Sequence, residues 1–129
     1  MKKGFKDLLA EANAIIETTS IEEALNRLGD EDTVFIDLRD TPELEREGKI
    51  PGALHASRGM LEFLIDPESP YHNSVFSSGK TFLLYCASGG RSAFAAQRAQ
   101  EMGLNPVAHI GGGLKAWKDV GGPIETVNL

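Results

Sequence analysis

The stretch that decides the fold is TFLLYCASGGRSAFAAQRAQEM, residues 81–102. Its first five residues are almost all apolar, which is typical of a short strand buried on both faces of a parallel sheet. Four small residues follow the cysteine, and an alanine-rich run then has the composition of a helix that ends at Gly103. A strand, a tight turn and a helix therefore follow one another directly.

The same alternation continues on both sides of this stretch. We expect strands at 33–37, 53–55, 81–85 and 106–110, and helices at 5–16, 21–28, 41–47 and 92–102, with a last helix that contains Leu114 and Trp117. Strands that alternate with helices predict an α/β domain with a central parallel sheet and helices on both faces. We assign residues 17–129 to this domain and residues 1–16 to a helical extension. Residues 57–80 form an irregular but ordered excursion with a short helix near Met60.

Composition excludes several classes of protein. The chain has 129 residues, of which 41% are hydrophobic and 25% are charged, so it is long enough and apolar enough for one packed domain. The net charge of −6 argues against nucleic acid or an anionic membrane surface as a partner. The single cysteine leaves no internal disulfide. Without a leader peptide or a membrane-spanning run in the sequence, we expect a cytoplasmic protein.

The turn after the central strand carries the chemistry. It consists of Cys86, Ala87, Ser88, Gly89, Gly90, Arg91 and Ser92. The small residues let several backbone N–H groups point into one concavity, and the helix adds the positive end of its dipole. Such a cradle favours a thiolate at its rim and holds an anion beside it. We therefore expect Cys86 to be a nucleophile that solvent can reach.

The same turn can also be interpreted as purely structural. A cysteine that ends an apolar strand is commonly a core residue, and two glycines before a helix can be a simple turn. A positive side chain such as Arg91 is unfavourable at the start of a helix, where the helix dipole is positive, unless it binds an anion. The combination of thiol, glycines and arginine in one segment favours function.

Four motifs in order give the chain a resemblance to the rhodanese-like sulfurtransferases, over about residues 17–127. They are VFIDLR at 34–39, GKIPGA at 48–53 (with Lys49 where the family usually has histidine), CASGGRS at 86–92, and Gly112-Gly113 followed by Trp117 and Gly122-Pro123. The resemblance implies that the Cys86 thiolate takes the outer sulfur of a small anionic donor such as thiosulfate. The persulfide then passes that sulfur to a thiophilic acceptor, cyanide or a thiol, without a metal or an organic cofactor.

We expect the loop amides from Ala87 to Ser92 and the side chain of Arg91 to hold the donor and the persulfide. Arg58 follows the strand near Leu54, so it either adds a second positive charge at the pocket mouth or is a solvated arginine on a loop. The alternative is a sulfur carrier or partner-binding module without catalysis. An arsenate reductase or phosphatase is disfavoured, because related enzymes of that kind have a Cys-x5-Arg loop, whereas Cys86 and Arg91 are spaced Cys-x4-Arg. The oligomeric state is left open.

Other polar residues have structural interpretations. We expect Asp37 and Arg39 to form an ion pair or a hydrogen-bonded corner. The three histidines have no metal-ligand spacing, and the glycines at 111–113 lack the dinucleotide-binding fingerprint. Trp117 is expected in the core, and the glutamates at 43, 45 and 47 on a solvated face.

Overall fold

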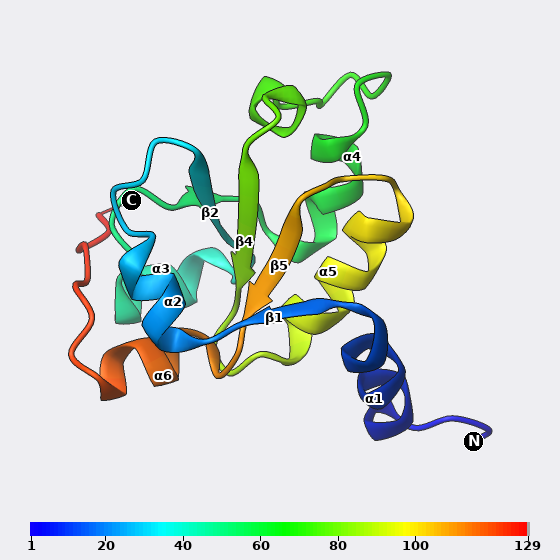
Figure 1. Cartoon of the computed structure of the whole chain (residues 1–129), viewed down its shortest axis with the longest axis horizontal. Helices are drawn as coiled ribbons and strands as arrows, with labels where there is room; N and C mark the ends of the chain where they lie inside the picture. Colours follow the sequence, from blue (N-terminus) through cyan, green and yellow to red (C-terminus); the bar gives the residue numbers. More distant parts are fainter. Residues whose placement is uncertain (129) are drawn as a thin grey trace.

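The computed structural model describes residues 1–128, and a parallel sheet is at its centre. The sheet has the strand order β1-β5-β4-β2-β3, and every neighbouring pair is parallel. The strands are β1 (Glu17–Thr19), β2 (Thr33–Asp37), β3 (Leu54–His55), β4 (Thr81–Tyr85) and β5 (Val107–Ile110). Their carboxyl ends lie at the same edge of the sheet, where the arrowheads of β4 and β5 meet (Figure 1). The predicted α/β architecture is confirmed.

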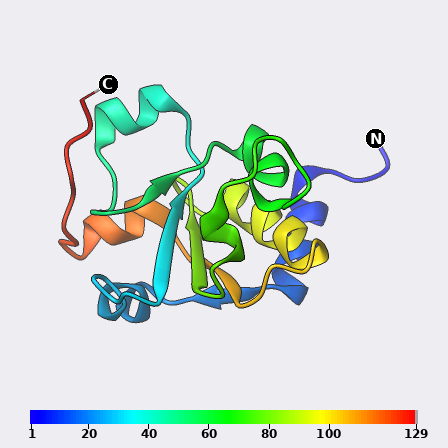
Figure 2. The same cartoon turned by 90° about the horizontal axis from the view of Figure 1, so that it is seen from above.

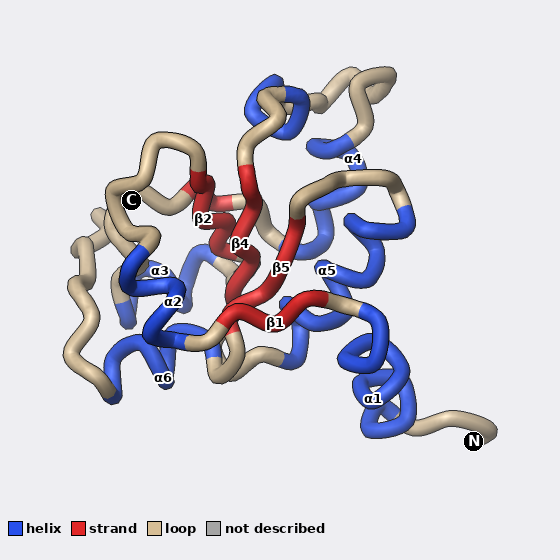
Figure 3. Tube along the Cα trace, viewed as in Figure 1, coloured by secondary structure: helices blue, strands red, loops and turns tan. Residues whose placement is uncertain are grey.

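Helices cover both faces of the sheet (Figures 1 and 2). The α-helices are α1 (Phe5–Ile15), α2 (Ile21–Asn26), α3 (Thr41–Glu47), α4 (Leu61–Ile65), α5 (Gly90–Glu101) and α6 (Gly113–Asp119). Two short 3-10 helices, η1 (Arg58–Met60) and η2 (Ser74–Ser77), frame the excursion between β3 and β4. In the tube view, α1, α4 and α5 lie on one side of the sheet and α2, α3 and α6 on the other (Figure 3).

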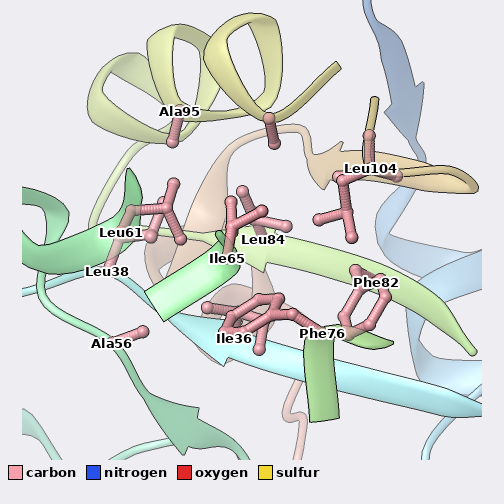
Figure 4. Close-up of a cluster of buried hydrophobic side chains, with 12 residues drawn as sticks. Ile36, Leu38, Ala56, Leu61, Ile65, Phe76, Phe82, Leu84, Ala95 and Leu104 are labelled. Carbon is pink, nitrogen blue, oxygen red and sulfur yellow. The ribbon is translucent and has the colours of Figure 1, made fainter. Parts of the chain in front are cut away.

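The alternation of side chains along β4 divides the core into two layers. Phe82 and Leu84 point toward α5 and α4, where they pack with Leu61, Ile65 and small residues of α5 such as Ala95 (Figure 4). Leu83 and Tyr85 point to the other face and pack with residues of α2 and α6, including the fully buried Trp117. Both faces of the strand are therefore dry, as its apolar run predicts.

The sequence pattern did not predict strand β1. β1 contains only Glu-Thr-Thr, and it pairs with β5 through the register Thr18 to His109. Two of its three residues are exposed, so it has no apolar pattern by which it could be recognised. The backbone hydrogen bonds of the sheet edge hold it in place, including one from the N–H of Gly111 to the carbonyl of Thr19 (3.0 Å).

The N-terminal helix α1 packs against α5. The Gln100 amide of α5 donates to the carbonyl of Ile15 at 3.1 Å, while Phe5, Leu8 and Ile15 keep exposed side chains. The predicted boundary between the helical extension and the domain lies at residue 16, and β1 begins at the next residue without a linker. Leu129, the last residue of the predicted domain, lies outside the described residues. Within residues 1–128, none of the helices has the length and apolar character that crossing a membrane requires.

Candidate active site

Cys86 is the residue that follows β4, at the edge of the sheet where the strands end. It is only 1% exposed, so the expectation that solvent can reach the sulfur is wrong for this structure. The reason is that the loop closes over it. The N–H groups of Gly89 and Ser92 donate to Cys86 Sγ at 3.2 and 3.4 Å, and the thiol donates to Ser92 Oγ at 3.5 Å.

These contacts give the loop its chemical character. Two main-chain dipoles point their positive ends at one sulfur, which stabilises negative charge there without any rearrangement of the loop. Gly89 can donate its N–H in this way because its φ of +109° lies in the left-handed region, which favours glycine. The predicted cradle of backbone amides is therefore present around Cys86. Helix α5 begins at Gly90, two residues before the predicted start.

Helix α6 supports the loop from the other side. The N–H groups of Leu114 and Lys115 donate to the carbonyls of Cys86 and Ala87 at 2.9 and 3.0 Å. Gly113 makes this approach possible, because a Cβ built on it would lie 2.5 Å from the Cys86 carbonyl oxygen, and its φ is +59°. The loop carbonyls are thus bonded to α6, which leaves the loop N–H groups to face the sulfur.

A buried network fixes the strand end beneath the cysteine. The Tyr85 hydroxyl donates to Asp37 Oδ2 at 2.6 Å and accepts from the Ile50 N–H at 3.1 Å. Burial, together with the nearby charge of Asp37, raises the pKa of Tyr85, so this phenol stays protonated as a donor. Asp37 is also paired with Arg39, whose Nε and terminal nitrogen lie 3.0 and 2.7 Å from the two carboxylate oxygens. The predicted structural role of Asp37 and Arg39 is confirmed.

Arg91 has a partner that the sequence reading did not foresee. Its guanidinium makes two hydrogen bonds, of 2.7 and 2.9 Å, to the carboxylate of Glu43 on α3. This bond lowers the pKa of Glu43 to about 2 and raises that of Arg91. Glu43 is only partly exposed and is bonded to Arg91, so the expectation that it lies on a solvated face is wrong. The anion bound by Arg91 in this structure is the Glu43 carboxylate. Glu43 and Ala87 line a pocket of about 330 Å³ at this side of the loop.

Arg58 lies on η1, and its side chain is paired with Glu62. Its guanidinium is 2.8 Å from Glu62 Oε1, one turn further along α4. It lines a separate hollow of about 260 Å³ together with Phe94, Gln97 and Arg98. The two pockets that adjoin the loop are lined by Ala87 on one side and by Ser88, Gly89 and Gly90 on the other, and Arg58 lines neither of them.

On the opposite side of the loop, a histidine reaches the site from β5. His109 Nδ1 is 2.9 Å from Ser92 Oγ, and its Nε2 is 3.2 Å from Thr18 Oγ1 on β1. The imidazole is 4% exposed, and burial lowers its pKa. A pocket of about 430 Å³ adjoins it, lined by Ser88, Gly89 and Gly90 of the loop, by Phe5, Leu9 and Asn13 of α1, and by Thr18, His109, Gly111 and Gly112.

Sequence reasoning missed the connection of His109 to the site, although a signal for it exists. The strand patterns place His109 at the carboxyl end of a strand, and in parallel sheets those ends surround the ligand site. The other two histidines have structural partners: His55 Nε2 lies 2.6 Å from the Arg39 carbonyl and His72 Nδ1 lies 3.0 Å from the Leu64 carbonyl. Across the described part of the chain, no three His, Cys, Asp or Glu side chains form a group suited to a metal ion.

Comparison with known proteins agrees with this architecture. The family model for the rhodanese-like domain matches residues 20–120. The mouse thiosulfate sulfurtransferase/rhodanese-like domain-containing protein 3 is 30% identical over 95 residues, which are 70% of this chain and 60% of the mouse protein. An uncharacterized protein of Synechocystis is 43% identical over 53 residues, 40% of this chain and 30% of that protein. The matches thus span between about a third and three fifths of these relatives.

Solved structures cover more of the chain. A Rhodopseudomonas palustris protein of unknown function, described as a possible tyrosine phosphatase, has a TM-score of 0.94 and 54% identity over 97% of this chain and 96% of its own. The polysulfide-sulfur transferase homodimer of Wolinella succinogenes has a TM-score of 0.72 and 28% identity, covering 96% and 88% of the two chains. The thiosulfate sulfurtransferase of Pseudomonas aeruginosa shares the fold, with a TM-score of 0.73 at 24% identity, over 93% of this chain and 22% of that one.

Proposed function

The chain belongs to the family of rhodanese-like domains, and from this premise we propose that it is a sulfurtransferase in which Cys86 carries the transferred sulfur. The donor is a small anion with a sulfane sulfur, such as thiosulfate, and the acceptor is a thiophile such as cyanide or a thiol. The observation that carries the proposal is the pair of amide hydrogen bonds from Gly89 and Ser92 to Cys86 Sγ. A structural core cysteine has no need of such donors.

The first half-reaction forms a persulfide. The Cys86 thiolate attacks the outer sulfur of thiosulfate, and the bond between the two sulfurs of the donor breaks. Sulfite leaves with the electron pair of that bond, so no external oxidant or reductant takes part. The negative charge that remains on the persulfide lies beside the N–H groups of the loop, which stabilise it.

The second half-reaction returns the enzyme to its starting form. A thiophile attacks the outer sulfur of the persulfide, and the bond to Cys86 Sγ breaks. With cyanide the product is thiocyanate, and the sulfur of Cys86 is again a thiolate held by the same two amides. Both steps are displacements at sulfur. They need only that the loop stabilises the anionic thiolate and persulfide of Cys86, and that the donor and the acceptor can reach this residue.

The route to the buried sulfur passes through the loop. The crest of the loop is formed by Ser88, which is exposed, and by Gly89 and Gly90. A side chain added at Gly90 would meet no atom within 4 Å, so there is open space beside the loop. We propose that the donor enters here and displaces loop contacts to reach Cys86.

Intact-mass measurement after incubation with thiosulfate tests the proposal. We expect the wild-type protein to gain one sulfur atom and to lose it on addition of cyanide. The Cys86→Ser variant should gain none, and since serine fits the same buried position, it serves as the matched control. Absence of the adduct in the wild-type protein contradicts the proposal. Adduct formation without multiple turnover supports the sulfur-carrier alternative instead.

Phosphate ester hydrolysis is the second candidate, because the Rhodopseudomonas palustris relative is described as a possible tyrosine phosphatase. Two features favour sulfur transfer. The Cys86–Arg91 spacing is one residue shorter than in the related phosphatases of the same architecture, and the Glu43 carboxylate is bonded to both terminal nitrogens of the Arg91 guanidinium. Hydrolysis of p-nitrophenyl phosphate that depends on Cys86, without a sulfur adduct, would favour the phosphatase.

A further inference from the structure

A continuous chain of hydrogen bonds leads from the buried thiol to the surface. Cys86 Sγ donates to Ser92 Oγ at 3.5 Å, and this oxygen is 2.9 Å from His109 Nδ1. On the far side of the ring, Nε2 is 3.2 Å from the hydroxyl of Thr18. Cys86, Ser92 and His109 are all buried, whereas Thr18 is exposed. The chain therefore connects a solvent-free sulfur with the pocket between α1 and the loop.

The bonds of this chain have a consistent direction. The Ser92 hydroxyl has one proton, and because its oxygen accepts from the thiol, that proton points to His109 Nδ1. The imidazole then has its own proton on Nε2, which donates to Thr18 Oγ1. Nδ1 is thus unprotonated, and the Ser92 hydroxyl links it to the thiol.

The surroundings leave the thiol as the group to which this imidazole is coupled. β1, β4 and α5 pack against β5, and their titratable side chains are Glu17, Tyr85, Arg91, Arg98 and Glu101. Glu17 and Tyr85 alternate to the opposite face, since Thr18 and Leu84 are the register partners of His109.

The remaining charges near β5 are satisfied by other groups. Arg91 is bonded to Glu43, and Arg98 forms ion pairs with Glu62 and Glu101. The α1 wall of the adjoining pocket consists of Phe5, Leu9 and Asn13, which have no charge.

We propose that His109 is a positioning residue that takes up the Cys86 proton through Ser92. The inference rests on the proposed function, because the thiolate it generates is the nucleophile of sulfur transfer. The Cys86 S–H proton moves to Ser92 Oγ while the Ser92 proton moves to His109 Nδ1. The products are a thiolate and an imidazolium, and the net charge of the site is unchanged. The Ser92 hydroxyl then donates to the thiolate as a third hydrogen bond, beside the two amides. Burial lowers the pKa of the imidazole, so the ring is neutral while the thiol is protonated. The charge of the nearby thiolate is what stabilises the imidazolium after the proton has moved.

The first test follows the rate of Cys86 alkylation by iodoacetamide from pH 5 to pH 10, since only the thiolate reacts. The substitution is His109→Asn, which retains an acceptor for Ser92 but cannot take up a proton. We expect the midpoint of the rate profile to move upward by about one pH unit, and the rate at pH 7 to fall about tenfold. His55→Asn makes the same change at a histidine bonded to a backbone carbonyl, so its profile should coincide with the wild type.

Two outcomes of this test overturn the inference. If the His109→Asn profile coincides with the wild type, His109 does not take up the proton. If the rate falls by the same factor at every pH with an unchanged midpoint, the role of His109 is only structural.

The second test needs no substitution at His109. In an NMR titration of the wild-type protein, the His109 ring signals should show an inflection at the pH where Cys86 ionises, and this inflection should disappear in Cys86→Ser. Coupling between two sites is reciprocal, so its absence from the histidine overturns the relay.

These readouts separate the relay from the proposed function. A shifted alkylation profile in a protein that forms no thiosulfate adduct supports the relay and contradicts sulfur transfer. Adduct formation with unshifted profiles supports sulfur transfer and contradicts the relay.

Discussion

Replacement of Gly113 by alanine tests how the loop around Cys86 is supported. Gly113 has a φ of +59°, and an added Cβ would lie 2.5 Å from the Cys86 carbonyl oxygen and 2.8 Å from the Ala87 carbonyl carbon and oxygen. These atoms are backbone, so they cannot move aside as a flexible side chain would. The substitution therefore pushes α6 away from the loop and breaks the hydrogen bonds from Leu114 and Lys115.

The expected loss of stability has two parts. A left-handed conformation costs a residue with a Cβ about 1–2 kcal/mol, and forced overpacking of a buried contact costs about 1–3 kcal/mol more. We therefore expect Gly113→Ala to reduce the free energy of unfolding by about 2–5 kcal/mol. Gly79→Ala is a matched control, because Gly79 has a φ of +77° but no atom within 4 Å of an added Cβ. It should lose only the first part.

Urea denaturation followed by Trp117 fluorescence measures both variants. Trp117 is the single tryptophan, is fully buried and lies on α6, so it reports directly on the displaced helix. Alkylation of Cys86 should also be faster in Gly113→Ala, since a displaced loop exposes the sulfur. If Gly113→Ala and Gly79→Ala lose the same stability and Cys86 keeps its reactivity, then α6 does not hold the loop.

Three further outcomes follow from the buried network and its charges. Tyr85→Phe removes the donor to Asp37 from a dry site, so the free energy of unfolding should fall by about 1–3 kcal/mol in urea titrations; an unchanged midpoint would contradict this role. Burial lowers the pKa of His109 below 6.5, so the folded protein binds fewer protons than the unfolded chain, and the stability should decline as the pH falls from 6.5 toward the lowered value. Urea midpoints at pH 7.5 and 5.5 measure this decline, which should be smaller in His109→Gln; equal declines would refute it. Glu43→Gln releases Arg91 to bind the donor, so the KM for thiosulfate should fall about twofold to fivefold, as an exposed ion pair is worth up to about 1 kcal/mol; a higher KM would show that Glu43 instead orients Arg91 for binding.

The sequence predicted the central strand and helix, but not the contacts between segments that are far apart in the chain. The strand before Cys86 and the helix after it were predicted because their apolar and alanine-rich runs are local signals. β1 was missed, since its pairing with β5 is a long-range contact and two of its three residues are exposed. The pairing of Arg91 with Glu43 was missed for a similar reason: the two residues are 48 positions apart.

By itself, the sequence determined the α/β fold and the family, and it pointed to the segment from Cys86 to Ser92 as the candidate site. These properties depend on patterns within single segments, which the chain carries before it folds. Only the tertiary structure decided which groups face the sulfur: the closure of the loop over the thiol, the support from α6 through Gly113, and the link from Ser92 to His109. These contacts join separate segments at one edge of the sheet, and their distances are fixed by how the strands and helices pack.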